Sequence, residues 1–162
     1  MPAPAGNRRR RLAAWAAVYL AVGLGGHWTS THYMLVTNES SSLPDFGYVV
    51  RLGTLPHKGD YVAFRLMNDP FYGSVTVVKK VGGVGGDVVT ALDRAYFVDG
   101  RMIGNAKPVS MTGVPLKAGP LGTIPTGQYF VYAPNKDSYD SRYANIGWIP
   151  AARIIGVAHP VL

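Results

Sequence analysis

Residues 74–87 read Ser-Val-Thr-Val-Val-Lys-Lys-Val-Gly-Gly-Val-Gly-Gly-Asp. Its β-branched residues followed by glycines predict a strand over 74–81 that ends in a turn. Successive side chains of a strand point to opposite faces. The face that carries Lys79 otherwise holds only valines, whereas the face that carries Lys80 also holds threonine and glycine. Lys79 is therefore the lysine that we expect to be buried.

Short β-branched or aromatic runs, separated by Gly, Pro, Asn and Asp, continue on both sides of this stretch. They predict further strands at 48–52, 61–66, 87–91, 95–98, 127–132 and 154–157. The dipeptide Asp99-Gly100 is typical of a two-residue hairpin turn, because both residues accept positive φ angles. Residues 105–123 are rich in Gly, Pro and Lys without a sustained period, which predicts an exposed loop or flap. We expect one mainly β, antiparallel domain over 29–162.

The N-terminal segment has a different composition. Four arginines at 8–11 precede the run 12–28, which is almost wholly apolar and just long enough for a helix that spans a bilayer. We interpret 12–28 as an uncleaved transmembrane anchor; a cleavable secretory signal or a buried core helix is the alternative. Because basic flanks stay in the cytoplasm, residues 1–11 are expected to be cytoplasmic. The domain after the anchor would then lie in the periplasm, on a bacterial inner membrane.

Composition excludes several classes of function. The formal net charge is +7, but removing the four arginines at 8–11 leaves +3, which is ordinary for a globular domain and does not favour nucleic-acid binding. The absence of cysteine excludes disulfides and cysteine-based metal or redox sites. The glycines after Lys80 do not match a phosphate-binding loop, since Val88 stands where the third glycine would be. We therefore expect no nucleotide, metal or other cofactor.

Two further segments carry hydroxyl groups. Residues 38–44 read Asn-Glu-Ser-Ser-Ser-Leu-Pro, and residues 137–143 read Asp-Ser-Tyr-Asp-Ser-Arg-Tyr. A serine becomes a nucleophile when a base takes its proton, and none of the four histidines (His27, His32, His57, His159) has a suitable sequence setting. A lysine can be that base if burial lowers its pKa from about 10.4. By itself the serine run is more typical of a turn or linker than of a nucleophile, and three serines compete for the role.

In order and composition the three segments resemble the type I signal (leader) peptidase family. The nearest resemblance is to its conjugative-transfer branch, the TraF-type pilin-maturation peptidases, and it extends over most of residues 38–156. It implies that Ser42 is the nucleophile and that Lys79, the first basic residue of its box, is the base. It also implies that the Ser40 hydroxyl and the Ser42 amide stabilise the oxyanion. The sequence departs from the branch in one place, because Gly47 follows Pro44 one position late.

The resemblance assigns the last segment a supporting role. Ser138 is expected to orient the lysine amine, and Asp140 is expected to form an ion pair with Arg142. Some members of the branch need the aspartate directly, so Asp140 is also grouped with the catalytic residues; capping of a turn is the alternative.

The function implied is that of a membrane-anchored serine endopeptidase with an acyl-enzyme intermediate. It would process, or cyclise, a conjugative pilin precursor as part of type IV secretion. The first alternative is a general type I signal peptidase that removes leader peptides from exported preproteins, and the second is a non-catalytic envelope assembly protein. The expected partners are a membrane-bound pilin precursor or preprotein, and membrane lipid.

Overall fold

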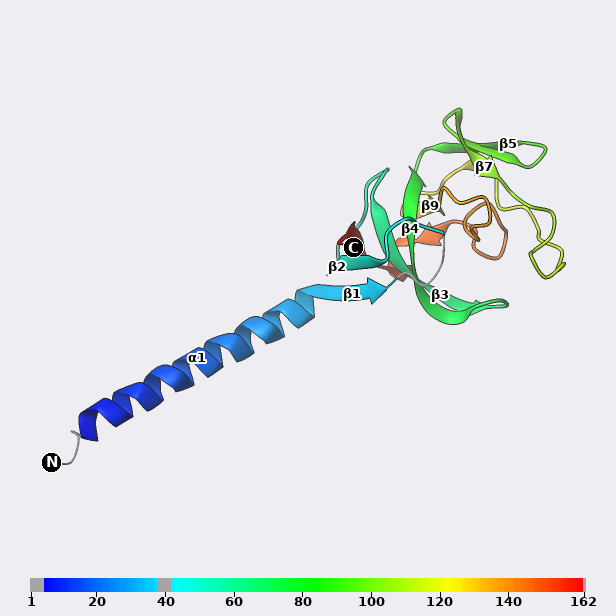
Figure 1. Ribbon diagram of the computed structural model, residues 1–162. Helices are drawn as coiled ribbons and strands as arrows, with labels where there is room; N and C mark the ends of the chain where they lie inside the picture. The colour runs from blue at the N-terminus through cyan, green and yellow to red at the C-terminus, as the bar shows by residue number, and fades with distance from the viewer. Residues whose placement is uncertain (1–4, 38–41, 162) are drawn as a thin grey trace. The chain divides into compact units, whose positions relative to one another are not determined.

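The computed structural model describes residues 5–37 and 42–161, except for the side chains of residues 5, 6 and 9. The chain forms two compact units, Met1–Tyr33 and Met34–Leu162. The first unit is a helix and the second is the β domain (Figure 1). The boundary lies near the one that the sequence predicts at residue 29.

Helix α1 runs over Ala5–His32 and contains the whole apolar run 12–28. Among the described residues, no helix is long and apolar enough to cross a membrane, so the predicted transmembrane anchor is not supported. The physical reason is that glycines at 23, 25 and 26 and His27 reduce the mean hydropathy of the second half of the run.

The β domain contains a seven-stranded sheet with the strand order β1-β2-β11-β3-β4-β9-β10. Each strand pairs antiparallel with its neighbours from β2 to β10. The bounds are β1 Tyr33–Thr37, β2 Gly47–Leu52, β3 Tyr61–Asp69, β4 Gly73–Val84, β9 Gln128–Tyr132, β10 Ile149–Pro150 and β11 Ile154–Pro160, with a short 3-10 helix η1 at Ala151–Arg153 before β11. The expected mainly β, antiparallel class is confirmed.

A second, four-stranded sheet has the order β7-β6-β5-β8. Its strands are β5 Val88–Leu92, β6 Ala95–Val98, β7 Arg101–Asn105 and β8 Gly122–Thr123. Figure 1 shows β5 and β7 as a separate group beyond β4 and β9. The turn between β6 and β7 has positive φ at Asp99 (48°) and Gly100 (77°), which confirms the predicted hairpin.

The glycines after Lys80 continue β4 instead of ending it at residue 81. A bulge lies between Val81 and Gly83, and the strand reaches Val84. A Cβ atom on Gly83 would lie 2.7 Å from Ile124 Cδ1, so the absence of a side chain lets β4 pass closely over the smaller sheet. The turn comes later, where the Asp87 carboxylate accepts a hydrogen bond from the Val84 amide at 2.9 Å.

Strands β1, β7, β8 and β10 were not predicted as separate elements. Two of them, β8 and β10, have only two residues each, too short for a period-2 pattern. The segment between β7 and β8 contains no named strand, as predicted for the flap, and is hereafter called the 106–121 loop.

Candidate active site

Lys79 lies in the middle of the large sheet, on the face predicted from alternation. It is opposite Val62 of β3 in the antiparallel register, and Val77 and Val81 share its face. Only 7% of its surface is exposed, which confirms the predicted burial. Its amine Nζ donates a hydrogen bond to Ser138 Oγ at 3.0 Å.

Burial is the largest influence on the charge of this amine. Desolvation disfavours the ammonium form and lowers the pKa of Lys79 to about 8, while the negative charge of Asp140 opposes the shift and the positive charge of Arg142 adds to it. Near pH 8 a substantial fraction of the amine is therefore neutral and able to accept a proton.

Lys80 has a different environment. It lies on the opposite face of β4, is partly exposed, and places its Nζ 5.7 Å from the centroid of the Tyr61 ring. This geometry is a cation–π contact of a charged lysine. The two adjacent lysines thus differ in solvation because a strand alternates its faces.

The segment that presents Ser138 is held by a buried ion pair. Arg142 donates to the Asp140 carboxylate from Nε at 2.8 Å and from Nη2 at 2.7 Å. Both side chains are almost completely buried. Asp140 also accepts a hydrogen bond from the Ala133 amide at 3.1 Å, and Arg142 donates to the Ser138 carbonyl at 3.2 Å. Both carboxylate oxygens are therefore engaged, and the turn that carries Ser138 is fixed.

The serine run lies only partly within the described residues. Asn38 and Ser40 fall outside them, and so does the oxyanion role assigned to Ser40. Ser42 is half-buried in a turn, and the adjacent Leu43 is buried in a cluster with Tyr48 and Val78. Packing of Leu43 thus anchors the start of the described segment to the sheet.

Ser42, Lys79 and Ser138 line one cleft with a volume of about 590 Å³. Its floor is apolar and comes mainly from β3 and β4, with Phe64, Leu66, Val75 and Val77 among the lining residues. Asp140 and Arg142 are not among the described residues that line it. The cleft therefore combines a half-buried hydroxyl, a desolvated amine and an apolar surface.

Other residues of the cleft were not predicted from the sequence. Tyr72 comes from the turn between β3 and β4, Met111 from the 106–121 loop, and Ile146 from the segment before β10. The sequence predicts that the loop is an exposed flap, but no local pattern shows which of its side chains line a cleft. Within the described residues no histidine lines the cleft, and the side chain of His57 is 93% exposed.

The comparisons with known proteins give the family. The model of the family "Signal peptidase, peptidase S26" matches residues 9–162, and the chain belongs to this family. The sequence-based resemblance to signal peptidase I is therefore confirmed, whereas the narrower resemblance to the conjugative-transfer branch stays a prediction.

Two relatives show the degree of similarity. The chain is 25% identical over 136 residues to a signal peptidase I of Rickettsia typhi, with 64% of this chain and 50% of that protein covered. It thus spans about half the length of this curated relative. A crystal structure of a signal peptidase I from Enterococcus faecalis is 26% identical, covers 64% of this chain and 97% of its own, and has a TM-score of 0.43.

Proposed function

We propose that this protein is a serine peptidase of the signal-peptidase type, with Ser42 as nucleophile and Lys79 as general base. The observation that supports this most is the burial of the Lys79 amine, hydrogen-bonded to Ser138, in the cleft that Ser42 also lines. A lysine without a buried acidic partner in direct contact can lose its proton near neutral pH. An exposed lysine cannot serve in this way.

The reaction is an acyl transfer in two steps. The Ser42 hydroxyl gives its proton to Lys79 Nζ while Oγ forms a bond to the scissile carbonyl carbon. The Ser42 amide and the Ser40 hydroxyl donate to the resulting oxyanion. The C–N bond then breaks, Lys79 returns the proton to the leaving amine, and water repeats the sequence on the acyl-enzyme.

Asp140 acts as a positioning residue in this proposal. Its two oxygens are occupied by Arg142 and backbone amides, so it is not placed to exchange a proton with substrate. It holds the turn that sets Ser138 against Lys79, and its charge limits how far the pKa of Lys79 is lowered.

The substrates that best fit the family are leader-bearing exported precursors, cleaved at the extracytoplasmic face of the membrane. An apolar cleft floor suits the apolar side chains found near leader cleavage sites. Pilin maturation is the narrower candidate, and it is favoured by Pro44, which follows Ser42 by two residues as in the conjugative-transfer branch. In that case the N-terminus of the pilin, instead of water, attacks the acyl-enzyme and gives a ring.

Cleavage assays with purified full-length protein test the proposal. We expect cleavage of an exported precursor with an Ala-x-Ala site, of a conjugative pilin precursor, or of both, and a loss of at least a thousandfold in kcat/KM for Ser42→Ala and Lys79→Ala. Ser41→Ala is the matched control and retains activity. Intact-mass measurement separates the products, since a cyclic pilin lacks one water. Undiminished cleavage by Ser42→Ala would contradict the assignment.

A further inference from the structure

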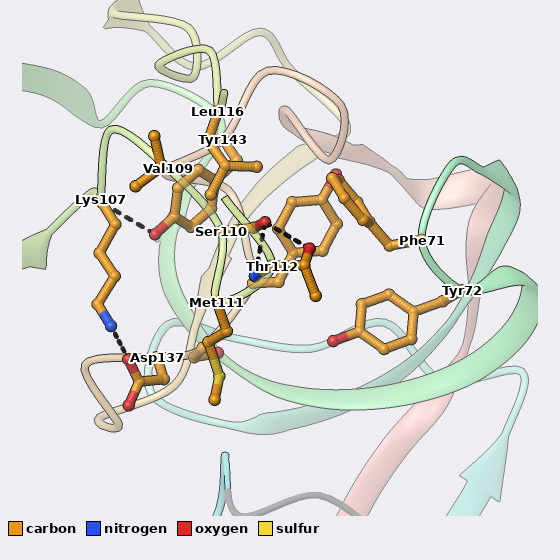
Figure 2. Close-up of a pocket in the computed structure, with 12 residues that line it drawn as sticks. Phe71, Tyr72, Lys107, Val109, Ser110, Met111, Thr112, Leu116, Asp137 and Tyr143 are labelled. Carbon is orange, nitrogen blue, oxygen red and sulfur yellow. Dashed lines mark hydrogen bonds and ion pairs between the residues drawn. The ribbon is translucent and has the colours of Figure 1, made fainter. Parts of the chain in front are cut away.

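A second pocket lies beside the proposed active site, between the 106–121 loop and the turn that joins β3 to β4. Its volume is about 240 Å³. Figure 2 shows Phe71 and Tyr72 on one side and Lys107 and Val109 on the other, with Tyr143 and Leu116 between them at the top of the view. No step of the proposed reaction uses this pocket.

The pocket adjoins the catalytic cleft. Tyr72, Met111 and Ser138 line both spaces. Since Ser138 is the hydrogen-bond partner of Lys79, the second pocket lies next to the residue that contacts the amine.

The lining favours a large uncharged side chain. Aromatic rings form much of the wall, and the two charged groups at the rim, Lys107 and Asp137, form an ion pair with each other (Figure 2). Their pairing leaves no unopposed charge to bind an ionised side chain. A cavity of about 150 Å³ suffices for benzene, so this pocket has room for one aromatic ring. Rings also pack favourably against rings at edge or offset geometry.

Hydrogen bonds hold the wall formed by the 106–121 loop. Arg94 donates from Nη2 to the carbonyls of Lys107 at 2.6 Å and Leu116 at 3.0 Å. The Tyr143 hydroxyl accepts a hydrogen bond from the Lys107 amide at 3.0 Å, and the Tyr96 hydroxyl donates to the Gly119 carbonyl at 2.9 Å. These bonds tie both ends of the loop to the smaller sheet and its neighbours, so the backbone on either side of the pocket-lining residues is held in place without a ligand.

We propose that this pocket is a second side-chain subsite, which receives an aromatic side chain of the peptide substrate at one position near the scissile bond. The proposal rests on the proposed function, because it takes the adjacent cleft to be the peptide-binding site. It predicts a preference for an aromatic residue in the substrate, in addition to the small apolar residues expected at the cleavage site.

The test measures peptide binding and peptide cleavage in separate experiments. The probes are acetylated, amidated eight-residue alanine peptides that each carry one phenylalanine, together with the all-alanine parent. Binding is measured by calorimetry to full-length Ser42→Ala protein, which does not consume the probe. We expect phenylalanine at one position to increase affinity about tenfold or more over alanine, the effect of burying one ring.

Two substitutions should remove this preference, and each has a matched control. Val109→Trp fills the pocket and Phe71→Ala removes part of its wall; in either background the ratio of phenylalanine to alanine affinity should fall at least fivefold. Val114→Trp lies in the same loop at similar exposure (43%, against 46% for Val109) but lines neither space. Phe46→Ala is the control for Phe71→Ala, and both controls should keep the ratio.

The outcomes separate the two proposals. Absence of a position that prefers phenylalanine, or a preference that survives both Val109→Trp and Phe71→Ala, would overturn the subsite even if the wild-type protein cleaves the peptides. Selective binding by Ser42→Ala without cleavage of any bound peptide by the wild type would overturn the peptidase function and leave the pocket established.

Discussion

At the scale of single residues, the proposed active site depends on the exclusion of water from the amine of Lys79. Lys79 is surrounded by valines and hydrogen-bonds to a neutral hydroxyl, while its neighbour Lys80 stays partly solvated over Tyr61. Two chemically identical side chains therefore differ in their ability to act as a base. The difference comes from solvation, because the charged form of Lys79 has lost most of its water.

The pH dependence of cleavage follows from this pKa. In the proposed reaction Lys79 is neutral when it accepts the Ser42 proton, so kcat/KM should rise as pH increases and level off above an apparent pKa of about 8. The measurement is a pH–rate profile on one peptide substrate. Lys80→Ala should show the same inflection as the wild type, whereas an inflection below about 7 would point to a group other than Lys79.

At the scale of elements, the segment 138–142 links the two sheets by hydrogen bonds. Arg142 donates to the Asn105 carbonyl at the end of β7 at 3.0 Å, and Ser141 exchanges two hydrogen bonds with Val131 of β9. The Asp140–Arg142 pair inside this segment is buried on both sides. A buried charge without its partner is strongly destabilising.

Removal of the Asp140 carboxylate should therefore reduce stability as well as activity. We expect Asp140→Ala to lower the free energy of unfolding by about 3–5 kcal/mol, measured by urea denaturation at pH 7. Asp137→Ala, one residue before this segment, is the control, because its ion pair with Lys107 is solvent-exposed, and its effect should be much smaller. Equal effects of the two substitutions would contradict a stabilising role of the Asp140–Arg142 pair in the segment that links the sheets.

At the scale of the whole molecule, the site is maintained at a cost in stability. The pKa of Lys79 is about 8 in the folded protein and near 10.5 in the unfolded chain, so the unfolded chain holds the proton more tightly. The destabilising effect of Lys79 is therefore absent above the unfolded pKa. It grows as pH falls toward the folded pKa and is complete below it. Below pH 8 the folded protein carries a desolvated ammonium group.

Replacement of this lysine by an apolar residue of similar length should relieve the cost. We expect Lys79→Met to be inactive yet more stable than the wild type by roughly 1–3 kcal/mol at pH 7. The difference in unfolding free energy between the two proteins should shrink as pH rises from 8 to 10.5. Denaturant titrations at several pH values measure this. A Lys79→Met protein that is less stable at pH 7 would show that the Ser138 and Asp140 interactions outweigh desolvation.

Local pattern determined most of the strands and the choice between two lysines. Alternation of valines predicted the buried face of β4, and Asp99-Gly100 predicted the hairpin, because side-chain direction and turn geometry depend on near neighbours in the chain. The roles of Ser42 and Ser138 came from resemblance to a family and not from local physics. The transmembrane reading of 12–28 depended on a run of marginal hydropathy, and the structure does not support it.

The family resemblance implied that Ser138 contacts Lys79, but the tertiary structure is needed to show how the two groups meet. Lys79 and Ser138 are 59 positions apart, and they come together because β4 pairs with β9, whose end leads into the 138–142 segment. Tyr72 and Met111 line both cavities from a turn and a loop without any local signal. Such contacts depend on strand order and on the path of loops, and both are set by how the whole chain buries its apolar surface.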